Sequence, residues 1–199
     1  MDLYGDLEEL QGMTRLLIDD VKMLRSKIGE GNPDPSDEEK AYRRFYVRAV
    51  FALVEAFVEQ HRRLVIHLCE AGKIELSENK LNQLRQIKRF LDTGRAVLRE
   101  EPNYMRTFDK IKEVYKAAAT GFGSPLAVTF GDEHWCAFKE AMEIRNQITH
   151  PKNMEGCWIF EPSLQKVIAA HDWFRALQND FVRIAREHRE KNRGLPPSW

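Results

Sequence analysis

The chain has 199 residues, of which 43% are hydrophobic and 31% are charged. This composition excludes a disordered chain, a collagen-like fibre and a disulfide-rich miniprotein. The 31 Lys and Arg residues equal the 31 Asp and Glu residues in number, so the chain lacks the general positive field with which non-specific nucleic-acid binders attract phosphate. Any contact with nucleic acid must therefore be local.

The sequence predicts a soluble, cytoplasmic protein without a membrane partner. The cysteines Cys69, Cys136 and Cys157 show no CxxC spacing and fit a reducing compartment. The first ten residues are acidic where a signal peptide would be basic. The longest apolar stretch, residues 47–58, is shorter than the roughly 20 residues that cross a bilayer.

Apolar residues recur at spacings of three and four along the chain, which predicts an all-α, multi-helix bundle without strands. The first two helices should cover residues 3–28 and 37–72, separated by a linker rich in Gly and Pro. A third helix should start after the N-cap Ser77, pass through Leu98 and end at Pro102, and a fourth should pass through residues 108–115.

A fifth helix should begin near Asp132 and end before Pro151, and a sixth should start at Pro162 and pass Ile184. This divides the chain into an N-terminal amphipathic helix (1–29), a helical domain (37–193) and a flexible tail (194–199). Five aromatic residues are predicted to lie in the core: Trp135, Phe138, Trp158, Trp173 and Phe174.

One motif stands out, Arg145-Asn-Gln-Ile-Thr-His150 at the end of the predicted fifth helix. The bare Arg-x4-His spacing is expected about 0.5 times by chance and occurs three times, so it carries no information. The further requirement for Asn after the Arg lowers the expectation to roughly 0.02, and only the copy at residues 145–150 meets it.

The chemistry of these three side chains suits a phosphodiester. Arg145 offers a planar fork of donors for phosphate, Asn146 offers an amide to orient phosphate or imidazole, and His150 offers an imidazole that can move protons. Pro151 disfavours the α conformation at His150, so the helix should end there and release the ring towards a cleft. The alternative interpretation is a helix C-terminus that is merely stabilised by a cation and an Asn cap.

The motif resembles that of the HEPN superfamily, small α-helical proteins of which many are ribonucleases with an Arg-x(4 to 6)-His motif. A second, weaker anchor is Phe51-Ala-Leu-Val-Glu-Ala-Phe57, which looks like the early helix of several HEPN groups. On this resemblance Glu55 supports the site. From its apolar context we expect Glu55 to be buried, either paired with a cation such as Arg145 or with a raised pKa.

The resemblance implies a HEPN-like domain acting as a metal-independent endoribonuclease on single-stranded RNA, without a cofactor, and leaving a 2′,3′-cyclic phosphate. A homodimer would bring two copies of Arg145, Asn146 and His150 to one cleft. The biological role implied is that of a toxin or defence effector with an antitoxin or other protein partner. HEPN members that only bind a nucleotide or a protein partner supply the alternative function, a non-catalytic helical dimer module.

Two further residues near the motif are candidate substrate contacts. Thr149 either touches substrate or bonds back to the carbonyl four residues earlier. Lys152 either attracts phosphate or is a solvated cation.

Overall fold

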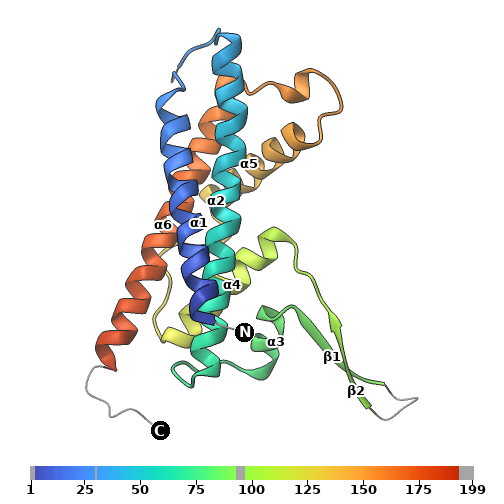
Figure 1. Cartoon of the computed structure of the whole chain (residues 1–199), viewed down its shortest axis with the longest axis vertical. Coiled ribbons are helices and arrows are strands. Elements are labelled where there is room, and N and C mark those ends of the chain that lie inside the picture. Colours follow the sequence, from blue (N-terminus) through green and yellow to red (C-terminus); the bar gives the residue numbers. More distant parts are fainter. Residues whose placement is uncertain (1–2, 30, 93–96, 193–199) are drawn as a thin grey trace. The chain divides into compact units, whose positions relative to one another are not determined.

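The computed structural model describes residues 3–29, 31–92 and 97–192, and it confirms the all-α, multi-helix class (Figure 1). The predicted tail, residues 194–199, lies outside the described residues. Within these ranges, no helix is both long and apolar enough to cross a membrane. The helices are α1 (Leu3–Ser26), α2 (Asp37–Glu70), α3 (Glu78–Leu84), α4 (Thr107–Phe122), α5 (Glu133–Thr149) and α6 (Glu161–Lys191), with a short 3-10 turn, η1 (Glu155–Cys157).

By its internal contacts the chain forms two compact units. The first contains Met1–Gln60 and Thr129–Leu177, and the second contains His61–Val128 and Gln178–Trp199. The long helices α2 and α6 therefore contribute their N-terminal parts to the first unit and their C-terminal parts to the second.

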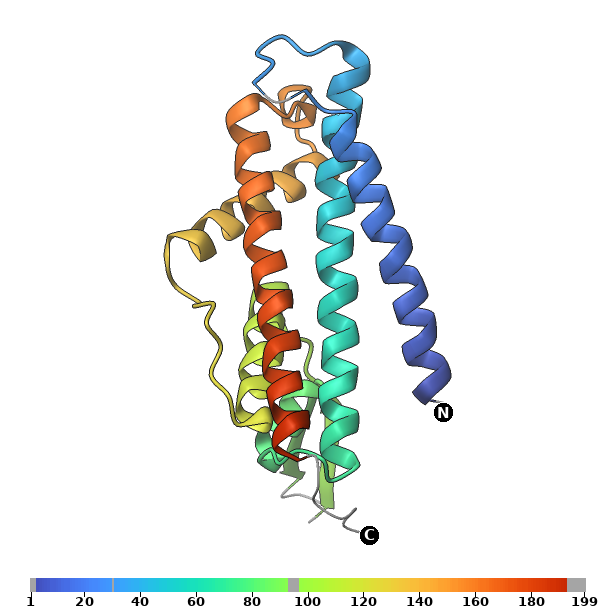
Figure 2. The same cartoon turned by 90° about the vertical axis from the view of Figure 1, so that its left-hand side faces the viewer.

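The first unit is held together by aromatic rings from α2, α5 and α6. Phe138 of α5 lies 5.8 Å from Phe51 of α2 and 5.0 Å from Trp173 of α6, measured between ring centroids. Helix α1 runs antiparallel to α2 and buries Val21 and Leu24, and Ile28 is buried just after its end (Figure 2). This is the core that the helical spacing predicts.

Four of the five aromatic residues predicted for the core are buried, but Trp158 is 44% exposed, so that prediction was wrong. Trp158 follows η1 in the loop between α5 and α6, where backbone alternation and not helix periodicity decides which side chain points inward. Ile159 is the buried residue there, and both Trp158 and Phe160 are exposed.

The prediction of one helix from Ser77 to Pro102 was also wrong. Ser77 is the N-cap as expected, but α3 ends at Leu84, and Gln86 has a φ of 58°, a left-handed conformation that an α-helix cannot contain. The chain continues as an antiparallel hairpin, β1 (Ile87–Asp92) and β2 (Val97–Pro102). The N–H of Asn103 donates to the carbonyl of Gln86 at 2.7 Å and closes the ladder.

In the second unit, the buried His61 lies parallel to Phe181 with ring centroids 3.7 Å apart. Its Nδ1 is 3.1 Å from the hydroxyl of Tyr115, which also accepts a hydrogen bond from the side-chain amide of Gln178. Burial lowers the pKa of His61 to about 3, so the imidazole is neutral at physiological pH. Burial also raises the pKa of Tyr115, which keeps its hydroxyl protonated.

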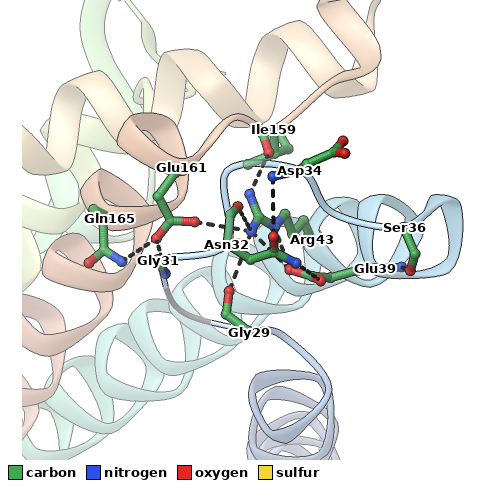
Figure 3. A network of polar contacts seen from close by, with 10 residues as sticks. All are labelled: Gly29, Gly31, Asn32, Asp34, Ser36, Glu39, Arg43, Ile159, Glu161 and Gln165. Carbon is green, nitrogen blue, oxygen red and sulfur yellow. Dashed lines mark hydrogen bonds and ion pairs between the residues drawn. The ribbon is translucent and has the colours of Figure 1, made fainter.

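One arginine of α2 organises the end of the first unit that contains the 27–36 linker (Figure 3). Arg43 is completely buried and donates to three backbone carbonyls: Gly29 at 3.3 Å, Asn32 at 3.0 Å and Ile159 at 3.3 Å. A single guanidinium thus fixes the linker after α1 and the residue that lies two positions before α6.

Two carboxylates balance the buried charge of Arg43. Glu39 lies 2.9 Å and Glu161 3.0 Å from its Nη2. Hydrogen bonds from Gln165 and then from the N–H of Gly31, together with the Arg43 charge, lower the pKa of Glu161. Glu161 therefore remains ionised opposite the guanidinium.

Candidate active site

Helix α5 positions the motif, and its two ends are set as the sequence predicts. Asp132 is the N-cap, and its carboxylate accepts a hydrogen bond from the N–H of Trp135 at 2.8 Å. The helix ends at Thr149, and His150 has left the helical region with φ −128° and ψ 64°. The predicted end of the helix before Pro151 is confirmed.

Arg145, Asn146 and Glu55 form a chain of polar contacts across two helices. The Nη2 of Arg145 lies 3.1 Å from the Oε1 of Glu55 on α2, and its Nη1 donates to the Oδ1 of Asn146 at 3.3 Å. The side-chain oxygen of Asn146 accepts a hydrogen bond from the Arg145 guanidinium. The NH₂ group of Asn146 therefore points its two N–H donors away from Arg145. The arrangement fixes the orientation of both motif side chains.

Glu55 is not buried, contrary to the prediction, since 45% of its side chain is exposed. Its neighbours Val54 and Ala56 are buried, but Glu55 lies on the edge of α2 that meets α5. The apolar context along the chain did not reveal this edge, because adjacent residues on a helix point 100° apart. Of the two expected outcomes, the structure contains the ion pair with Arg145.

His150 occupies the exposed end of this arrangement. Its backbone N–H donates to the carbonyl of Asn146 at 2.9 Å and closes the last helical turn. Across the described parts of the chain, its imidazole has no hydrogen-bond or ion-pair partner, so both ring nitrogens are open to a ligand. An imidazole exposed at the end of the helix that carries this oriented amide and guanidinium can exchange protons with a bound phosphodiester.

The two candidate substrate contacts lie in different settings. The hydroxyl of Thr149 donates to the carbonyl of Arg145 at 2.8 Å, which is the back-bonding alternative. Lys152 is exposed in the loop that follows His150. The structure therefore gives Thr149 a local role in the last turn of α5.

The sequence interpretation missed Arg48. This exposed residue of α2 donates from Nη2 to the carbonyl of Ile148 at 2.9 Å, two residues before His150. Arg48 precedes Glu55 by seven residues, so both lie on one face of α2 and both contact the last turn of α5. That spacing is visible in the sequence, but its meaning depends on knowing that α5 packs there.

The described residues contain no group of three or more His, Cys, Asp and Glu side chains that could hold a metal ion. The guanidinium and the amide of the motif can donate hydrogen bonds to an oxyanion, and an imidazolium can protonate one. In the comparisons with known proteins, no family model, no curated protein and no solved structure matches this chain.

Proposed function

We propose that the protein is a metal-independent endoribonuclease of the HEPN type that cleaves single-stranded RNA. The observation that carries the proposal is the exposed imidazole of His150 at the end of α5, five residues after Arg145, whose guanidinium Glu55 and Asn146 hold in place. All four residues belong to the first unit, so their mutual geometry is internal to one compact body.

The reaction forms a bond between the 2′-oxygen and phosphorus and breaks the bond between phosphorus and the 5′-oxygen. A base removes the proton of the 2′-hydroxyl, and an acid protonates the leaving 5′-oxygen. Arg145 stabilises the charge that develops on the non-bridging oxygens, and Asn146 positions the phosphate or the imidazole. The product is a 2′,3′-cyclic phosphate, and DNA is not cleaved because it lacks the attacking hydroxyl.

The need for both an acid and a base supports a two-fold homodimer, in which each protomer contributes one His150 to the cleft. The loop after His150 exposes apolar side chains suited to such an interface: Met154 is 72%, Trp158 44% and Phe160 57% exposed. Apolar side chains that are exposed close together are more stable when an interface buries them than when they face solvent, so they favour association.

The test is incubation of single-stranded RNA with the full chain in EDTA, compared with His150→Ala and Arg145→Ala. Each substitution should lower the cleavage rate by about 10²-fold or more, the loss expected for a general acid or base and for an oxyanion-stabilising group. Circular dichroism should show an unchanged helix content, because the side chain of His150 is exposed and that of Arg145 is partly exposed.

A control for contamination is built into this comparison, because a co-purified nuclease would cleave equally in all three preparations. A requirement for Mg²⁺ would contradict the mechanism. If a folded dimer cleaves no RNA, the alternative gains support, namely a non-catalytic dimer module that binds a nucleotide or a protein partner.

A further inference from the structure

The cation that the structure leaves uncompensated at the motif is Arg48, not Arg145. The charge of Arg145 faces the Glu55 carboxylate at 3.1 Å. Arg48 contacts a neutral acceptor, the carbonyl of Ile148, and no carboxylate pairs with it in the described ranges. A phosphate arriving at His150 therefore finds a full positive charge on α2, one helix away from the motif.

Arg48 also has donors to spare. A guanidinium carries five N–H donors, and the contact with Ile148 uses only Nη2. The carbonyl of Ile148 belongs to the last turn of α5, where helix carbonyls lack a partner within the helix. This contact orients the guanidinium at the helix end that carries His150 and leaves Nε and Nη1 for an anion.

Arg44 extends the positive charge along the same face of α2. It precedes Arg48 by four residues, and side chains at this spacing are neighbours on a helix. Arg44 is partly exposed, and the structure shows no carboxylate paired with it among the described residues. Together, Arg44 and Arg48 form a short basic stripe that leads away from the motif.

We propose that Arg48 binds a phosphate of single-stranded RNA at the His150 site, with Arg44 contacting the strand further along α2. This inference rests on the proposed ribonuclease function and adds a substrate-binding residue outside the Arg-Asn-x3-His motif. The local basic stripe reconciles a nucleic-acid substrate with a chain of zero net charge, because the attraction is confined to the site.

The first experiment measures cleavage kinetics of Arg48→Gln. Glutamine keeps an amide that can donate to the Ile148 carbonyl but removes the charge. KM for RNA should rise about tenfold, the loss expected when one charge-assisted hydrogen bond disappears, and kcat should change less than about threefold. The matched control is Arg175→Gln, an exposed arginine of α6 in the same unit that pairs with Asp172, and it should leave both constants unchanged.

The second experiment measures binding of a fluorescent 2′-O-methyl RNA, which cannot be cleaved, at several salt concentrations. Arg48→Gln should make the slope of log K against log salt shallower by about 0.7, the value for one lost phosphate contact on a single strand. Arg48→Lys, which retains the charge, should preserve the wild-type slope and also serves if the glutamine variant does not fold.

The outcomes separate the two proposals. If the wild type cleaves RNA but Arg48→Gln only lowers the melting temperature and leaves KM and the salt slope unchanged, Arg48 is merely a helix cap and this inference is wrong. If Arg48→Lys makes the slope of log K against log salt as shallow as Arg48→Gln does, the charge at position 48 does not contact a phosphate and this inference is wrong. If the wild type neither binds nor cleaves RNA, the proposed function itself fails.

Discussion

Three arginines of the first unit show how surroundings assign different tasks to one side chain. Arg43 is completely buried and directs its donors to backbone carbonyls and two carboxylates, so it organises the fold. Arg145 is oriented by Glu55 and Asn146 beside the candidate catalytic histidine. Arg48 is exposed and pairs with no carboxylate in the described residues, which leaves its charge available to an anion.

At the residue scale, the second unit offers a prediction about pH. The pKa of buried His61 is lowered to about 3, whereas in the unfolded chain it is near 6.5. Between these values the unfolded state binds a proton that the folded state does not. The stability contributed by neutral His61 is therefore complete above pH 6.5 and is lost progressively as the pH falls towards 3.

Urea unfolding at pH 7.5 and pH 5 measures this effect, and His61 should account for about 2 kcal/mol of the difference in unfolding free energy. His61→Phe keeps a ring against Phe181 and removes the titrating group, so its pH dependence should be weaker by that amount. An equally steep loss of stability in this variant would show that another group controls acid unfolding. His171, whose pKa is also lowered mainly by burial, is the first residue to replace in that case.

The residues of the motif could be predicted because one helix carries them all. Arg145, Asn146 and His150 follow one another on α5, and Pro151 determines where the helix ends. The exposure of Glu55 and the contact of Arg48 could not be predicted, because both depend on how α5 packs against α2. Sequence reasoning thus named the motif residues and the Glu55 partner of Arg145, but it did not predict the exposure of Glu55 or the contact of Arg48 with α5.

At the scale of elements, the helix ends that carry local capping residues were predicted from the sequence. The hairpin of β1 and β2 was missed. Ser77 is an N-cap as predicted, and the helix predicted to begin near Asp132 has that residue as its N-cap; both side chains accept hydrogen bonds from the first turn. The apolar positions 81, 84, 87, 91 and 98 have spacings that suit a helix, which hid the two strands.

The Arg43 network yields a prediction about how elements are joined. Arg43→Met removes the guanidinium that contacts Gly29, Asn32 and Ile159, and leaves the carboxylates of Glu39 and Glu161 without their cation. Removing one partner of a buried ion pair costs about 3–5 kcal/mol, and the free energy of unfolding in urea should fall by this amount.

The neighbouring residue supplies a matched control for Arg43. Arg44→Met changes the same side chain at a more exposed position and should alter the free energy of unfolding by no more than about 0.5 kcal/mol. Equal effects of the two substitutions would mean that the buried network does not stabilise the first unit.

At the scale of the whole molecule, the candidate site and the titrating His61 network belong to different units. Glu55, Arg145 and His150 lie in the first unit, and His61, Tyr115 and Phe181 lie in the second. The all-α class could be predicted from periodicity over the whole chain, but the grouping of α2 and α6 into two units depends on long-range contacts that no local pattern contains. What the sequence does suggest at this scale is the homodimer.

The proposed dimeric site makes a prediction that a monomeric enzyme would not share. If each active site needs His150 from both protomers, a wild-type chain paired with a His150→Ala chain is inactive. With a tenfold excess of His150→Ala and free exchange of protomers, only about one in eleven wild-type chains finds a wild-type partner, so activity should fall to about a tenth. The measurement uses saturating RNA, which prevents the inactive chains from acting by sequestering substrate.

The control for this mixing experiment is the double variant His150→Ala/Trp158→Glu. A charge at the exposed Trp158 should prevent pairing through the apolar loop, because an interface would have to bury it unpaired. An excess of this variant should leave wild-type activity intact, and light scattering should give a monomer. Undiminished wild-type activity in an excess of His150→Ala, once exchange has been verified with labelled chains, would mean that one protomer suffices. The second proton-transfer group would then have to come from within the same chain.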